Sequence, residues 1–231
     1  MAPMYLPDIL TAPLRRVDDR TSDLALLDTD GLQIGVWECL PGTAHDAGGD
    51  FDETMLMVAG SAEVRGDDGS VFRLAPDVLW ATPRRWGSTW AVEQTVRKLY
   101  VIDGRAAKGT PSERPAALAG VSTSPLPAAE PRPVVLDGDP HEASADLWES
   151  HRVSTGVWEC TPGTFPFRRD GYHEVFCILS GHATLHTDEG MAFDLRPGAV
   201  LLTPAGLTGR WEVHELVRKA YTIVTLDEAG A

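Results

Sequence analysis

The stretch Gly35-Val-Trp-Glu-Cys-Leu-Pro-Gly-Thr43 recurs later in the chain as Gly156-Val-Trp-Glu-Cys-Thr-Pro-Gly-Thr164. The two copies lie 121 positions apart, and this offset holds without a gap through residue 100 of the first copy. Over those 66 positions, 24 residues are identical. Because chance would give only a few identities, the sequence predicts a duplicated domain. The spacing is too long for a solenoid unit and suits two compact domains.

Composition is that of an ordinary globular protein. The chain has 231 residues, of which 43% are hydrophobic and 23% charged, so each copy can bury a core. An excess of 34 acidic over 20 basic side chains gives a formal charge of −14. We expect neither nucleic acid nor a membrane as a partner, because nucleic acid and anionic membranes need a basic surface and no stretch approaches the roughly 20 apolar residues of a membrane span.

The termini and the cysteines predict a cytosolic protein. The first 16 residues lack the basic end and the apolar run of a signal peptide. The three cysteines, Cys39, Cys160 and Cys177, form no C-x-x-C pair and are too few for a disulfide scaffold.

Short apolar runs and turn signals predict strands in both copies. Residues 54–59 and 175–180 are largely apolar runs that end at a glycine. Residues 67–69 and 188–190 have the acidic-glycine sequence of hairpin turns, since glycine tolerates the positive φ that such turns need. No segment shows sustained helical periodicity. The pattern therefore predicts an all-β sandwich or barrel.

A proline-rich stretch separates the copies. It holds six prolines together with many alanines and serines, so it cannot form the interior of a sheet and is predicted to be an extended connection. The predicted organisation is an N-terminal arm at 1–29, a barrel at 30–103, a connection at 104–134 and a second barrel at 135–231. We expect the arm to add a strand or a lid.

Both copies resemble the cupins, which are small jelly-roll barrels. The first cupin motif ends in Glu-x6-Gly, as at Glu174 and Glu53 with the glycines seven positions on. The second motif, Gly-x5-Pro-x-Gly, is complete only in the C-terminal copy, at 198–206. The resemblance implies two tandem cupin jelly-roll barrels (the double-stranded β-helix), a bicupin.

Longer stretches resemble one branch of the cupins, the cupin-3 group, which is EutQ-like and ureidoglycine aminohydrolase-like. Its recurring text includes G-V-W-E-C-x-P-G, P-A-G-x-T-G-x-W-E-V and V-R-K-x-Y. These match residues 156–163, 204–213 and 217–221.

The resemblance also implies a metal site that the sequence lacks. Typical cupins bind a divalent metal with three histidines and one glutamate. Here either Arg168 and Asp170 or Phe167 and Arg169 stand at the first two C-terminal histidine positions, and Gly209 stands at the third. The first copy lacks the three histidines as well. We therefore expect no cofactor. A rearranged metal site that uses the other C-terminal histidines is an alternative, and those residues are His173, His182, His186 and His214.

Several C-terminal residues are candidates for the site. The resemblance implies that Glu174 points into the barrel, where an apolar environment would raise its pKa and suit it to proton transfer. Its alternative role is a structural carboxylate that holds Arg218 or a backbone amide. Tyr172 and His173 are expected to assist catalysis at the barrel mouth. The candidate substrate-binding residues are Arg168, Arg169, Trp158, Trp211 and Arg218.

These residues predict a small-molecule enzyme that does acid/base chemistry on a compact anionic substrate. The reaction would be an isomerisation, elimination, cyclisation or hydrolysis, without the usual metal. Two alternatives stay open: a non-catalytic ligand-binding or regulatory bicupin, and a metal-dependent enzyme with a rearranged site. The expected assembly is a monomer that acts as a pseudo-dimer, or a homodimer.

Overall fold

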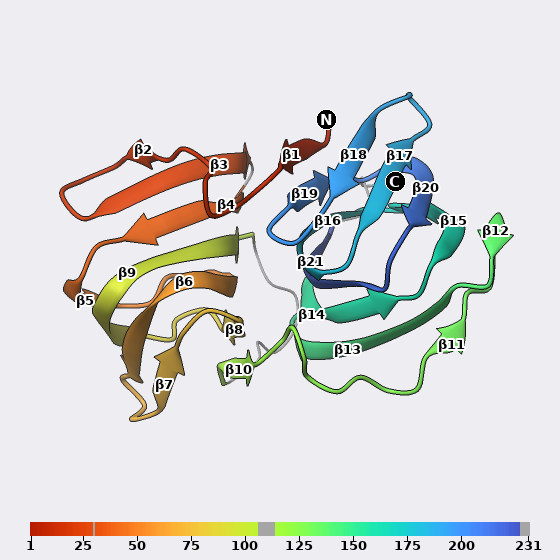
Figure 1. Ribbon diagram of the computed structural model, residues 1–231. Helices are drawn as coiled ribbons and strands as arrows, with labels where there is room; N and C mark the ends of the chain where they lie inside the picture. Colours follow the sequence, from red (N-terminus) through yellow and green to blue (C-terminus); the bar gives the residue numbers. More distant parts are fainter. Residues whose placement is uncertain (30, 106–113, 227–231) are drawn as a thin grey trace. The chain divides into compact units, whose positions relative to one another are not determined.

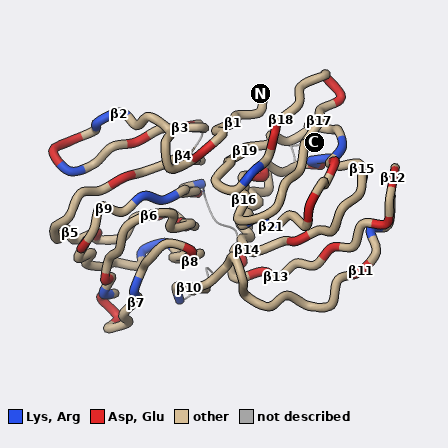
Figure 2. Tube along the Cα trace, viewed as in Figure 1, with Lys and Arg blue, Asp and Glu red and all other residues tan. Residues whose placement is uncertain are grey.

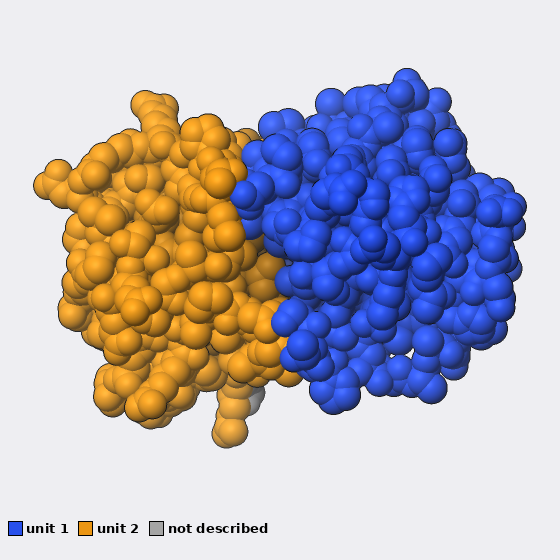
Figure 3. All heavy atoms as spheres, in the orientation of Figure 1, with its two compact units in different colours: residues 1–9, 122–147, 154–231 blue, residues 10–121, 148–153 orange. Residues whose placement is uncertain are grey.

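The computed structural model describes residues 1–29, 31–105 and 114–226 (Figure 1). All regular structure within these ranges is β-strand, which confirms the predicted all-β class. Two compact units are coloured separately in Figure 3: residues 10–121 with 148–153, and residues 1–9, 122–147 and 154–231. Each unit holds one copy of the repeat, and we call them the N-terminal and the C-terminal barrel.

One sheet, in the order β10-β8-β6-β9-β4-β3-β2, winds through the N-terminal barrel, with β5 paired to β9 and β7 to β6. Its strands are β2 (Arg15–Arg16), β3 (Thr21–Thr29), β4 (Leu32–Cys39), β5 (Gly42–Asp46), β6 (Asp52–Gly66), β7 (Val71–Leu74), β8 (Val78–Thr82), β9 (Ser88–Asp103) and β10 (Ala116–Ala119). The long strands β6 and β9 belong to both faces of the barrel, and Met57, Val64 and Trp80 are fully buried in the core that they enclose.

Two sheets form the C-terminal barrel, in the orders β1-β19-β16-β21-β14-β13-β11 and β12-β15-β20-β17-β18. The strands are β1 (Met4–Leu6), β11 (Glu130–Pro131), β12 (Asp137–Gly138), β13 (His141–Glu149), β14 (Val153–Cys160), β15 (Gly163–Arg168), β16 (Tyr172–Ser180), β17 (Ala183–Thr187), β18 (Ala192–Leu195), β19 (Val200–Thr203), β20 (Thr208–Val213) and β21 (Val217–Thr225). Leu185, Leu201 and Phe176 are fully buried in its core.

A glycine bends the chain between the two faces of each barrel. Gly181 has φ +80°, and a Cβ there would lie 2.0 Å from the carbonyl oxygen of Leu216. Gly60 has φ +77°, and its Cβ would lie 2.1 Å from the carbonyl oxygen of Thr95. Only glycine fits such a position. The Glu-x6-Gly motif therefore couples the inward glutamate to the bend that closes the barrel.

The segments outside the repeats add edge strands. In the N-terminal arm, β1 pairs with β19 and Ile9 is buried, while β2 and β3 extend the sheet of the N-terminal barrel. In the proline-rich connection, β10 and β11 lie at sheet ends, where missing N–H donors are tolerated. Residues 106–113 of the connection lie outside the described residues.

Charged positions are interspersed along the strands of both barrels (Figure 2). The hairpin turns predicted at 67–69 and 188–190 are present, with φ +85° at Gly69 and +89° at Gly190. No helix among the described residues is long and apolar enough to cross a membrane.

Candidate functional site

A cavity of about 250 Å³ opens inside the C-terminal barrel. Strands of both its sheets contribute side chains, because inward positions alternate with outward ones along each strand. The lining residues are Arg132, Ser144, Trp158, Phe165, Phe167, Arg169, Tyr172, Glu174, Trp211, Lys219, Tyr221 and Ile223. Glu174, Arg169, Tyr172, Trp158 and Trp211 were candidates from the sequence, and the structure brings all five to this cavity.

Glu174 lies buried between two cations. Its backbone on β16 is opposite Thr203 of β19 and Ile223 of β21. The ammonium Nζ of Lys219 donates a hydrogen bond of 2.5 Å to Oε1, and the guanidinium of Arg169 forms an ion pair with Oε2. Each of the three side chains is less than one-tenth exposed. The sequence alternative that Glu174 holds Arg218 is therefore wrong.

Aromatic rings surround the ammonium of Lys219. Nζ lies 4.5 Å from the ring centroid of Phe176, 4.9 Å from that of Trp158 and 5.1 Å from that of Trp211. Such contacts stabilise a buried cation electrostatically and exclude water from it. The repeated tryptophans are thus both core residues and cavity walls.

The pKa of Glu174 is lowered, contrary to the expectation from sequence. Burial alone would raise the pKa of this carboxyl, but the charges of Arg169 and Lys219 together outweigh burial. The expectation of a raised pKa considered only the apolar surroundings. Glu174 is consequently ionised near neutral pH and is a poor proton donor there.

The pKa of Lys219 is also lowered. Burial is the largest cause, the attraction of Glu174 opposes it, and the neighbouring charge of Arg169 adds to it. Desolvation beside another cation is one of the ways in which proteins activate a lysine amine. Lys219 is therefore the group of this cluster that is best suited to exchange a proton.

The ionised Glu174 predicts how stability depends on acid. Its folded pKa lies below the ordinary value of 4.5, so its ion pairs stabilise the fold fully above that pH and are lost as pH falls through the folded pKa. We expect the difference in thermal midpoint between the wild type and Glu174→Gln to be steady at higher pH and to shrink below about pH 4.5. Circular dichroism melts measure it, and a difference that grows towards acid would contradict the lowered pKa.

Arg169 and Arg168 face different surroundings. Arg169 Nε donates a 2.9 Å hydrogen bond to Thr203 Oγ1, and its guanidinium lies 4.9 Å from the ring centroid of Phe167. Its Nη1 lies 3.4 Å from the hydroxyl of Tyr172, whose own proton goes to the carbonyl of Arg168. The side chain of Arg168 is 71% exposed and pairs with Asp170, outside the cavity.

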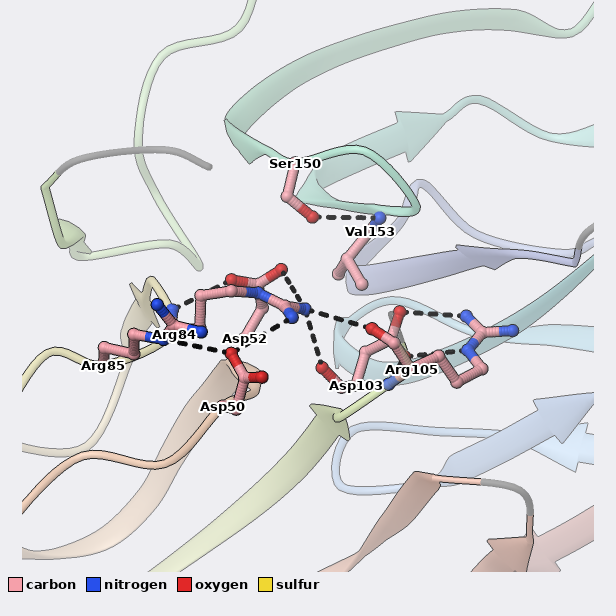
Figure 4. A network of polar contacts seen from close by, with 8 residues as sticks. All are labelled: Asp50, Asp52, Arg84, Arg85, Asp103, Arg105, Ser150 and Val153. Carbon is pink, nitrogen blue, oxygen red and sulfur yellow. Dashed lines mark hydrogen bonds and ion pairs between the residues drawn. The ribbon is translucent and has the colours of Figure 1, made fainter. Parts of the chain in front are cut away.

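His173 holds a turn and does not line the cavity. Its Nδ1 accepts a 2.9 Å hydrogen bond from the backbone N–H of Ala205. At the matching place in the other copy, the backbone N–H of Arg84 donates to Asp52 Oδ1 at 3.0 Å, within the polar network of Figure 4. Because a carboxylate and an imidazole serve the same turn, the structure supports a structural role for His173.

Arg218 points away from the cavity. Its guanidinium donates to Glu159 Oε2 at 3.2 Å and to the hydroxyl oxygen of Ser124 at 2.8 Å. Of the adjacent pair on β21, Lys219 is the inward residue. The expectation that Arg218 pairs with the glutamate is corrected accordingly, since the residue of β21 that pairs with Glu174 is Lys219.

The residues present do not fit the metal that typical cupins hold. Two cations occupy both oxygens of Glu174, and a metal ion beside them would be repelled. The other histidines lie outside the cavity. Their hydrogen-bond partners are Asp194 for His182 at 2.6 Å, Glu212 for His186 at 3.1 Å and Thr184 for His214 at 2.9 Å. In the part of the chain that the structure describes, no group of three or more His, Cys, Asp or Glu side chains could hold a metal ion.

The N-terminal barrel repeats the core of this arrangement at the same offset. Lys98 Nζ donates to Glu53 Oε1 at 2.8 Å, and it lies 4.9 Å and 5.2 Å from the ring centroids of Trp37 and Trp90. The lysine was missed from sequence, although the repeated V-R-K-x-Y text placed it in both copies. Cys177 is not a candidate nucleophile. Burial raises the pKa of its thiol to about 12 and keeps the thiol protonated.

A family comparison agrees with this duplicated geometry. The family model of the EutQ-like cupin domain matches residues 27–100 and 147–221. The chain belongs to the EutQ-like cupin family. As a EutQ-like bicupin it carries one family domain in each barrel, which confirms the resemblance drawn from the repeated motifs.

Solved structures show the same fold at low identity to this EutQ-like cupin. A protein of unknown function from Pseudomonas syringae pv. tomato has a TM-score of 0.80 at 18% identity, covering 96% of this chain and 99% of that one. YlbA from E. coli has a TM-score of 0.71 at 9% identity, covering 99% and 93%. Oxalate decarboxylase from B. subtilis has a TM-score of 0.56 at 15% identity, covering 97% and 77%. No curated protein sequence matches the chain.

Proposed function

We propose that the C-terminal barrel binds a compact carboxylate and moves a proton on it. The observation that carries the proposal is the buried charge imbalance: among the described residues, Arg169 and Lys219 form ion pairs with Glu174 alone. With Lys219 protonated, this group holds one more positive than negative charge in a place where unpaired charge is costly. A bound monoanion restores the balance.

Cavity size limits the ligand. At roughly 30 Å³ per water molecule, about 250 Å³ corresponds to roughly eight waters. A small 2-oxo acid such as pyruvate fits within this volume. Its carboxylate would lie beside the guanidinium of Arg169 and the ammonium of Lys219, whose summed charge exceeds that of Glu174.

Lys219 carries the proton in this proposal. The protonated form binds the anion, and the lowered pKa makes the neutral amine accessible as the reactive form. In that form the amine takes a proton from the carbon next to the carbonyl: the C–H bond breaks, an N–H bond forms, and the electron pair moves into the carbonyl as an enolate. Glu174 stays ionised and stabilises the ammonium that results. The aromatic walls exclude water, which strengthens these charge interactions. Return of the proton completes the exchange. Tyr172 is a positioning residue, since its hydroxyl contacts Arg169.

Proton exchange tests the proposal. In D2O, we expect the wild type to replace the methyl hydrogens of pyruvate by deuterium faster than buffer alone, as measured by proton NMR. Lys219→Met should reduce the exchange to background, because methionine keeps the apolar volume and removes the amine. Arg168→Gln is the matched control, since its side chain lies outside the cavity.

Two outcomes would overturn the assignment. Pyruvate that binds to the wild type without exchange would make the barrel a binding module. Exchange that survives in folded Lys219→Met would assign the proton to another group.

A further inference from the structure

We propose that the N-terminal barrel holds a second ligand site, for a compound with an ammonium group on an apolar body. Its cavity of about 480 Å³ is larger than that of the C-terminal barrel. It lies at the matching place, because Glu53, Lys98, Trp37 and Trp90 line it as their counterparts line the other cavity. The ligand class differs because the surrounding residues differ.

The guanidinium of the C-terminal site has no counterpart here. Gly48 stands at the position of Arg169, with φ +75°, and a Cβ there would lie 2.8 Å from the backbone of Trp86. A side chain is therefore excluded at this position. Among the described residues, Glu53 has an ion pair to Lys98, through Oε1, and to no other side chain. Its second oxygen is thus left for a donor from a ligand.

Two further replacements enlarge the cavity and make it acidic. Ala44 stands at the position of Phe165, and Asp46 at the position of Phe167. Loss of the two rings opens the space beside Trp37 and Trp90. Asp46 adds a carboxylate to the lining, with Oδ1 accepting a 2.9 Å hydrogen bond from the N–H of Gly48.

The charges that line the cavity favour a cation. Four carboxylates (Asp18, Asp19, Asp46 and Glu53) face two cationic side chains, Arg20 and Lys98, for a net charge of −2 when His45, which also lines the cavity, is counted as neutral. Both cations are engaged: Arg20 donates to the carbonyls of Leu40 at 3.0 Å and Thr43 at 3.1 Å, and Lys98 to Glu53. The net negative charge of this lining disfavours an anion. An ammonium would meet carboxylates and tryptophan walls, which suit a cation on an apolar body.

Three ligands of one shape test the charge preference. Benzylamine is cationic at neutral pH, benzyl alcohol neutral and benzoate anionic. By calorimetric titration of the full chain, we expect benzylamine to bind about tenfold or more tightly than benzyl alcohol, and benzoate to bind weakest. Glu53→Gln should remove the preference for benzylamine. Glu93→Gln, which removes an exposed carboxylate of β9 outside the cavity, should keep it.

A second variant guards against failure of Glu53→Gln to fold. Ala44→Phe restores the ring of the C-terminal barrel at an exposed position of β5 and removes no charge. It should block benzylamine by filling the cavity. Failure of benzylamine to bind, equal binding of benzoate, or full binding to folded Ala44→Phe would overturn the proposal. These outcomes are independent of the pyruvate tests, because the two cavities share no lining residue.

Discussion

Replacing Glu174 with glutamine is expected to lower the free energy of unfolding of the C-terminal barrel by about 3–5 kcal/mol. The variant leaves Arg169 and Lys219 buried without their carboxylate. Lys219 can release its proton, but Arg169 cannot, since a guanidinium stays protonated in proteins. The uncompensated guanidinium therefore accounts for most of the loss.

The matched variant is Glu53→Gln in the N-terminal barrel. Glu53 has a single cation partner, and its side chain is 12% exposed against 5% for Glu174. Its replacement should lower the free energy of unfolding by less than that of Glu174, because the charge of Lys98 can be solvated by water or removed by loss of a proton. Thermal melts of both variants near neutral pH measure the difference. An equal effect of the two variants, or a stable Glu174→Gln, would contradict the buried charge imbalance.

Replacing Arg169 with glutamine is expected to weaken pyruvate binding by about 10- to 100-fold. This range corresponds to the loss of charge-assisted hydrogen bonds to a carboxylate. The variant should remain folded, because Glu174 keeps Lys219 as an ion pair of balanced charge. Binding and folding are thereby separated in one substitution.

Arg168→Gln is the control for this prediction. It removes the same charge one residue earlier, from a side chain that is 71% exposed and paired with Asp170. Calorimetric titration should give it the wild-type affinity. Equal weakening in both variants would show a general effect of net charge and would contradict binding at the cavity.

Much of the fold was predictable because duplication displays the same signals twice. The repeated text from residue 35 fixed the domain number, and the glycines after Glu53 and Glu174 marked the bends. The pairing register of edge strands such as β1 and β10 was not predictable. Their pairing depends on long-range contacts with β19 and β8 that no local pattern encodes.

The site was predictable in part. Glu174, Trp158 and Trp211 follow from motif positions. The motif positions could not decide between Arg218 and Lys219. Adjacent side chains on a strand point to opposite faces, and the sequence does not show which of the two faces the cavity. The orientation of β21 matters for the charge of Glu174. With Lys219 facing the cavity, the carboxylate is ionised, whereas an apolar barrel alone would have kept it neutral.

The central claim is that a bound carboxylate balances the excess positive charge that Arg169 and protonated Lys219 hold beside Glu174. Titrating the wild type with pyruvate by calorimetry, in two buffers of different ionisation enthalpy, measures binding and the linked protons together. We predict proton uptake on binding at every pH at which free Lys219 has lost its proton and the bound form has regained it, because the bound anion raises the pKa of Lys219 towards its ordinary value. Binding without proton uptake at any pH in this range, or no binding, would contradict the claim.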